Sequence, residues 1–172
     1  MKNLDEKDIT IEEKEKIIKE WRQKYKTLEE SIDKSSDDDT LIAKAKEKLS
    51  AGDLDGAEKL LEQSFEKYSK QTAEASKKAA KSAYELGLIK ELKLEYEKAN
   101  AFFEKAVEYD PENGLYLNQL GIILYTLGKY EKAIEYYEKA LAIAEKFLGK
   151  DHPKTKITAE SLQKAISKKK RF

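Results

Sequence analysis

A period of 34 residues in the second half of the chain constrains its fold more than any other feature of the sequence. When the stretch that ends at Ala106 is aligned with the stretch that ends at Ala140, identical or similar residues coincide. The matched pairs are Leu86 and Leu120, Gly87 and Gly121, Tyr96 and Tyr130, Ala99 and Ala133, Phe103 and Tyr137, and Ala106 and Ala140. Small and aromatic residues that recur at a fixed period in the low thirties are typical of a stacked helical repeat. One such hairpin cannot cover its apolar face alone, so the sequence predicts neighbouring hairpins that bury it between them.

The recurring residues resemble the tetratricopeptide repeat family, whose pattern runs Leu-Gly, then Gly-x-Tyr, then Ala, an aromatic residue, Ala and Pro. The resemblance implies an all-α fold, an α-solenoid of antiparallel helical hairpins in a right-handed superhelix. Ala57 and Ala99 are separated by 42 residues, and the third repeat has the same excess over the basic period. Kinesin light chain repeats use this longer spacing, and residues 130–157 resemble them most closely.

The repeat register divides the chain into three parts. We expect three hairpins in residues 37–153, over about 38–79, 80–113 and 114–153. Residues 1–36 are predicted to form an amphipathic helix and a linker, and residues 154–172 a capping helix with a basic tail. The additional residues of the first hairpin are helix-forming, so we expect one extra turn on each side of a bend near Gln71.

The turn of the second hairpin departs from the pattern at Leu94, which stands where Gly128 stands in the third. Glycine adopts the left-handed backbone conformation at little cost. If Leu94 has to adopt it, we expect a strain of roughly 1 kcal/mol relative to Gly.

The N-terminal helix carries a narrow apolar seam on an otherwise charged surface. Thr10 and Glu13 have the spacing of a capping box, so the helix should begin near Ile11. The seam then advances in steps of three and four residues through Ile18, Trp21, Tyr25, Leu28 and Ile32. Three interpretations remain open: the seam caps the repeat array, joins two copies into a homodimer, or occupies the protein's own binding groove.

Composition argues against several classes of partner. Basic and acidic residues both number 34, so no overall positive field attracts nucleic acid or an anionic membrane. No run approaches the ~18 apolar residues that a membrane span needs. The polar N-terminus lacks the apolar core of a signal peptide, so we expect a cytoplasmic protein. Cysteine is absent, which excludes disulfides and thiolate metal ligands.

No constellation of residues indicates catalysis, a metal or a cofactor. His152 is the only histidine and stands in a turn before the last helix. The DLDG sequence at 53–56 has some features of a calcium loop, but Ala51 would occupy the first ligand position. The same stretch fits the turn between two helices of the repeat. We therefore predict that the protein is not an enzyme.

The resemblance places function in a concave groove lined by the first helix of each repeat. Asn and Gln side chains there can bond a peptide backbone through donor and acceptor, and Tyr, Leu and Ile supply apolar pockets. The alignment projects these residues into the groove: Lys81, Tyr84, Glu85, Leu88, Asn118, Gln119, Ile122 and Tyr125. Glu85 and Glu91 would repel a carboxylate, which disfavours capture of a chaperone's C-terminal carboxylate.

The sequence therefore predicts a non-enzymatic scaffold or adaptor that binds a peptide or helix of another protein in this groove. The alternative is a structural module that oligomerises through the seam from Ile18 to Ile32.

Overall fold

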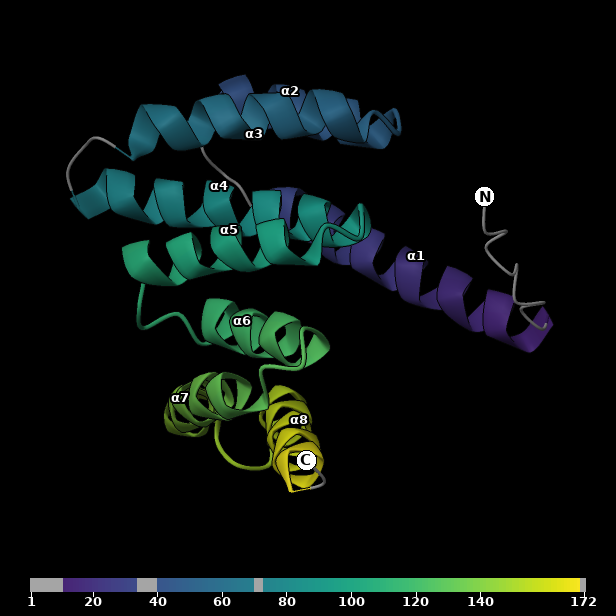
Figure 1. Cartoon of the computed structure of the whole chain (residues 1–172). Coiled ribbons are helices and arrows are strands. Elements are labelled where there is room, and N and C mark those ends of the chain that lie inside the picture. Colours follow the sequence, from purple (N-terminus) through teal and green to yellow (C-terminus); the bar gives the residue numbers. More distant parts are fainter. Residues whose placement is uncertain (1–10, 34–39, 70–72, 171–172) are drawn as a thin grey trace, which may run out of the picture.

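The regular secondary structure of the chain is α-helical throughout the residues that the computed structural model describes, which are 11–33, 40–69 and 73–170. Figure 1 shows the helices stacked in layers, with the first half of α1 projecting to one side. In chain order they are α1 (Ile11–Asp33), α2 (Thr40–Ser50), α3 (Leu54–Tyr68), α4 (Ala73–Leu92), α5 (Tyr96–Tyr109), α6 (Gly114–Thr126), α7 (Tyr130–Leu148) and α8 (Pro153–Lys169).

The helices pair into three hairpins that stack into an α-solenoid. α2 packs on α3, α4 on α5 and α6 on α7 within the hairpins, while α3–α4 and α5–α6 contacts join one hairpin to the next. α8 packs on α7 and closes the array (Figure 1). The predicted all-α solenoid with a C-terminal helix is confirmed.

The boundary between the first two hairpins lies earlier than the expected residue 80. α4 begins at Ala73, so residues 73–79 form its first turns. α3 ends at Tyr68, and the expected bend at Gln71 lies outside the described residues. α3 has 15 residues against 14 in α5, and α4 has 20 against 13 in α6. The additional residues therefore lengthen mainly the start of α4, and not both helices equally as expected.

The small residues of the repeat lie where helices approach each other closely. A Cβ atom added at Gly87 would lie 2.4 Å from Cε1 of Phe103, and one at Gly121 would lie 2.7 Å from Cδ1 of Tyr137. Ala99 and Ala133, the other small residues of the pattern, have no exposed surface. Each glycine therefore makes room for the aromatic ring of the second helix in its own hairpin.

We expect Gly87→Ala to lower the free energy of unfolding by about 2 kcal/mol, because the buried Phe103 ring has to move. This loss should exceed the gain of about 1 kcal/mol from the higher helix propensity of Ala. Urea denaturation monitored by circular dichroism measures the net change in the free energy of unfolding. Gly87→Ala combined with Phe103→Leu should recover part of the loss, whereas a stabilising Gly87→Ala would contradict this packing.

Leu94 adopts the left-handed conformation, with φ of 61°, close to the 73° of Gly128 in the next hairpin. Its N–H donates to the Glu91 carbonyl at 3.0 Å, and the Glu95 N–H donates to the Lys90 carbonyl at 2.9 Å. The same two hydrogen bonds close α6 at Gly128. Both turns are Schellman motifs. In the turn of the second hairpin, a leucine occupies the position that is usually glycine.

Leu94→Gly should therefore raise the free energy of unfolding by about 1 kcal/mol. The side chain is 64% exposed, so little packing is lost. The reciprocal change, Gly128→Leu, should cost a similar amount, because nothing lies within 4 Å of an added Cβ and only the backbone is strained. Thermal unfolding of the two variants should shift in opposite directions, and a destabilised Leu94→Gly would refute the strain.

Candidate protein-interaction surface

The N-terminal helix α1 lies against α2 and α4, the first helices of the first two hairpins (Figure 1). The Ser31 hydroxyl donates to Oε1 of Glu85 at 3.2 Å, and Nζ of Lys24 pairs with Oε1 of Glu91 at 3.0 Å. The order of these contacts makes α1 antiparallel to α4. Leu28 lies between the two contacts on the same side of α1 and has no exposed surface. α1 thus covers the face that the family resemblance assigns to the groove.

Only the C-terminal half of the seam takes part in this docking. The Tyr25 hydroxyl donates to the Leu49 carbonyl of α2. Trp21 stacks on Tyr25 with ring centroids 5.9 Å apart, yet 42% of Trp21 and 49% of Ile18 are exposed. The side chain of Ile32 lies outside the part of the chain that the structure describes.

The groove residues predicted on α4 are mostly inaccessible in this arrangement. Tyr84, Glu85 and Leu88 are buried, and Lys81 keeps partial exposure. The Tyr84 ring lies 5.9 Å from that of Phe103 and 5.0 Å from that of Tyr116, so it fills the space between two hairpins. The sequence alignment could not reveal this, because the aligned residue of the third hairpin, Asn118, is polar.

Glu85 is a fully buried carboxyl group. Burial raises its pKa to about 7, although the attraction of Lys81 and the Ser31 hydrogen bond oppose the shift. Its Oε2 atom has no hydrogen-bond partner among the described residues. The α1–α4 contact therefore contains an acid that burial holds toward its protonated form.

The groove residues predicted on α6 remain partly exposed. Nε2 of Gln119 donates to Oε2 of Glu91 at 2.9 Å, and the Thr158 hydroxyl of α8 donates to Oδ1 of Asn118 at 3.2 Å. Ile122 lies against the core with part of its surface exposed. Tyr125 and four residues of α8 line an open depression of about 280 Å³; those from α8 are Gln163, Lys164, Ser167 and Lys168. The open part of the groove therefore lies between α6 and α8.

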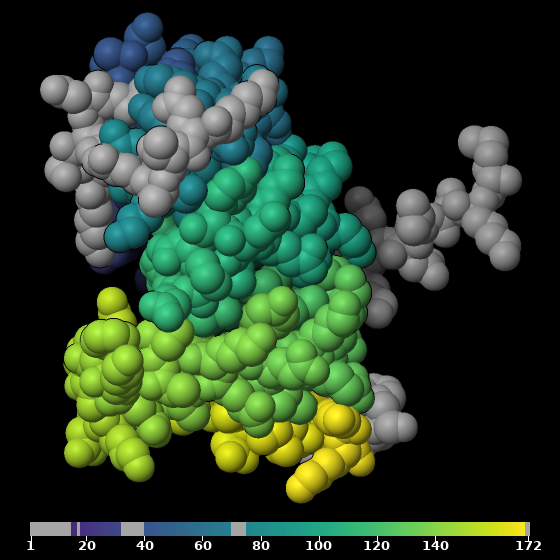
Figure 2. Space-filling view, turned by 90° about the vertical axis from the view of Figure 1, so that its left-hand side faces the viewer, coloured from purple at the N-terminus to yellow at the C-terminus, as the bar shows by residue number. Residues whose placement is uncertain are grey.

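A larger cavity of about 440 Å³ adjoins this region between α6, α7 and α8. Its lining is mainly apolar and includes Leu115, Asn118, Ile143, Phe147, Lys154 and Ile157. Figure 2 shows the C-terminal part of α7, in yellow-green, projecting beside the yellow α8. Sequence reasoning missed Ile143 and Phe147 because they belong to a second helix, which the resemblance does not place in the groove.

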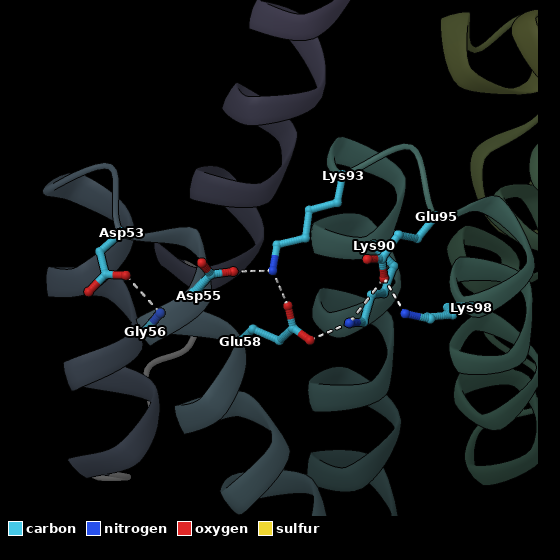
Figure 3. Close-up of polar contacts among 8 residues, drawn as sticks. All are labelled: Asp53, Asp55, Gly56, Glu58, Lys90, Lys93, Glu95 and Lys98. Atoms are coloured by element: carbon cyan, nitrogen blue, oxygen red, sulfur yellow. Dashed lines mark hydrogen bonds and ion pairs between the residues drawn. The ribbon is translucent and has the colours of Figure 1, made fainter. Parts of the chain in front are cut away.

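Ion pairs at the turn ends of the first two hairpins form a separate polar cluster (Figure 3). Glu58 of α3 contacts both Lys90 and Lys93, and Lys93 also contacts Asp55. Glu95 pairs with Lys90 at 3.2 Å and with Lys98 at 3.1 Å. This cluster joins α3, α4 and α5 and gives these residues a structural role.

The DLDG sequence at 53–56 and His152, the candidates in the sequence for metal binding and catalysis, each cap a helix. Oδ1 of Asp53 accepts a hydrogen bond from the Gly56 N–H at 2.8 Å and begins α3. Nδ1 of His152 accepts from the Lys154 N–H at 3.2 Å and begins α8. Within the described residues, no group of three or more His, Cys, Asp or Glu side chains is arranged to hold a metal ion.

Fold and surface together define the class of this protein, an α-solenoid of helical hairpins. Two models of the tetratricopeptide repeat family match the chain, one over residues 77–113 and the other over residues 114–162. These adjoining matches span half of the 172 residues. The chain belongs to the tetratricopeptide repeat family, whose members are generally non-enzymatic protein-interaction modules.

The solved structures that resemble this chain include two crystal structures of MamA. One has 21% sequence identity and a TM-score of 0.39, with 74% of this chain and 95% of the MamA chain covered. The other has 20% identity and a TM-score of 0.39, with 76% and 91% covered. No curated protein matches the sequence. Among the described residues, no helix is both long and apolar enough to span a membrane.

Proposed function

We propose that this protein is a scaffold or adaptor that holds a peptide or helix of another protein in the groove formed by the first helices of its hairpins. The observation that carries the proposal is the position of α1, which lies along α4 through Lys24, Leu28 and Ser31. The face formed by these first helices therefore accommodates a helix. Between α6 and α8 the groove has no such occupant among the described residues.

The open part of the groove combines the contacts that a partner segment needs. Gln119 offers an amide that can donate to and accept from a peptide backbone. Ile122 and Tyr125 offer apolar surface, and Lys164 and Lys168 of α8 add positive charge at the end of the groove near Tyr125. A partner segment with apolar and acidic side chains fits this combination.

The competing function, oligomerisation through the whole seam, requires contacts that α1 already uses within the chain. Leu28 is fully buried and the Tyr25 hydroxyl is bonded to α2. A symmetric dimer along the seam would have to release both residues first. This cost favours groove binding over a coiled-coil dimer.

The test compares partner capture by the wild-type chain and by Gln119→Ala/Tyr125→Ala, using quantitative mass spectrometry of proteins retained from the source cells. We expect proteins enriched by the wild type to be lost by the groove variant. Lys132→Ala/Glu135→Ala, which changes two exposed residues of α7, is the matched control and should keep them. Capture that is equal for the groove variant and the wild type would overturn the proposal.

A further inference from the structure

The large apolar side chains that the described residues leave exposed gather in two places, with Leu94 in its turn as the exception. One place is the projecting first half of α1, called the arm here, with Ile18 and Trp21. The other is the rim of the cavity between α6, α7 and α8, called the pocket here, with Leu115, Phe147, Leu148 and Ile157. Exposed apolar surfaces of this kind mark sites that bind another molecule or another copy of the chain.

The pocket has two small polar residues where an aromatic pair lies between the preceding first helices. Between α4 and α6, the Tyr84 and Tyr116 rings lie with their centroids 5.0 Å apart, tilted by 33°, and fill the space between two successive first helices. The corresponding residues of α6 and α8 are Asn118 and Thr158, which follow the two tyrosines by 34 and 42 residues. They also meet across two helices, through their 3.2 Å hydrogen bond. Both side chains are smaller than tyrosine, and the cavity of about 440 Å³ adjoins them.

The pocket beside Asn118 and Thr158 has room for an aromatic ring of another molecule. Ile143 and Phe147 of α7 and Leu115 of α6 provide apolar walls, as Phe103 does for Tyr84. Lys154 is the charged residue of the lining. An aromatic side chain with a carboxylate next to it would therefore match both the shape and the charge of the pocket.

The arm carries such a side chain. Trp21 is the one tryptophan of the chain, and it lies between Glu20 and Arg22, which are both exposed. Among the side chains of α1 that the structure describes, Lys24 is the first with a polar or cation–π contact to the body, through Glu91 and the Tyr96 ring. Figure 1 shows the arm projecting on the right, whereas α6 begins on the left of the array. The arm therefore cannot reach the pocket of its own chain in this conformation.

We propose that the arm of one copy inserts Trp21 into the pocket of a second copy. The two surfaces differ, so the contact is head-to-tail, and each added copy leaves one arm and one pocket free for further growth. This self-assembly goes beyond partner binding in the groove. It also differs from a symmetric dimer along the seam, because Tyr25 and Leu28 stay in their contacts with the body.

Two variants that each lack one surface test the proposal on the full chain. The arm variant is Ile18→Ser/Trp21→Ser, and the pocket variant is Phe147→Ser/Ile157→Ser; all four side chains are more than 40% exposed, so the fold should persist. Leu94→Asn removes an exposed leucine outside both surfaces and is the control. Sedimentation velocity and tryptophan emission are measured over a series of protein concentrations.

We expect the wild type and Leu94→Asn to associate as concentration rises, while each of the two variants sediments as a 19.8 kDa monomer. An equimolar mixture of the two variants should form a 1:1 complex of twice that mass that grows no further. The arm variant has no tryptophan, so a blue shift in the mixture reports burial of Trp21 of the pocket variant. A monomeric wild type, a pocket variant that self-associates, or a mixture without the complex and blue shift would each overturn the proposal.

Discussion

Replacing Glu85 with Gln raises the free energy of unfolding at pH 8 by about 3 kcal/mol. The wild-type carboxyl group is fully buried, and burial raises its pKa from the usual 4.5 to about 7. At pH 8 the folded protein has to hold a buried carboxylate, and the difference between the two pKa values corresponds to about 3 kcal/mol. Glutamine keeps an acceptor for the Ser31 hydroxyl and carries no charge.

The pH dependence of the free energy of unfolding tests independently whether Glu85 lowers stability. Below pH 4.5 the group is protonated in both states and imposes no penalty. As the pH rises the unfolded chain ionises first, so the stability supplied by this group falls between pH 4.5 and about 7 and is constant above. Urea denaturation across this range should show a fall in the wild type that is smaller in Glu85→Gln. Glu97→Gln, at an exposed position of α5, is the control, and a Glu85→Gln variant that is less stable at pH 8 would contradict the account.

Replacing Glu58 with Gln lowers the free energy of unfolding at pH 7 by about 3 kcal/mol, because the buried Lys90 loses a charged partner. Lys93 loses one as well (Figure 3). Burial alone would raise the pKa of Glu58, but the hydrogen bonds and charges of these lysines outweigh it and hold the pKa below its usual range. The stability that Glu58 supplies is therefore present above pH 4.5 and lost as the pH falls through its folded pKa.

Glu62→Gln, one turn further along α3 and exposed, is the matched control and should change stability by less than about 0.5 kcal/mol. The difference between the two variants should shrink in acid, where Glu58 is protonated in the wild type too. Equal effects of the two substitutions at pH 7 would show that the ion pairs of Figure 3 do not join the hairpins.

The fold could be derived from sequence because its determinants recur at one spacing. At Gly87 and at Gly121, an aromatic ring of the second helix lies close to the first helix. The two glycines occupy the same position of the repeat in the sequence alignment. Leu94 departs from that pattern, yet the hydrogen bonds of the turn impose the glycine conformation on it. Repetition thus made both the packing and its exception predictable.

The surface was less predictable because it depends on which helix covers which. The seam of α1 has the same pattern whether it caps the array, dimerises or lies in the groove, so the contacts of Lys24, Tyr25 and Ser31 with the body could not be derived from it. Alignment placed Tyr84 and Asn118 at equivalent positions, but burial depends on volume. A tyrosine fills the space between hairpins, whereas an asparagine leaves the cavity open.

Hydrogen exchange of the full chain with a captured partner tests the central claim most directly. The account predicts that partner binding slows amide exchange in α6 and α8 and leaves α5 and α7, the second helices, unchanged. Protection confined to α5 and α7, or unaltered by Gln119→Ala/Tyr125→Ala, would contradict a groove formed by the first helices.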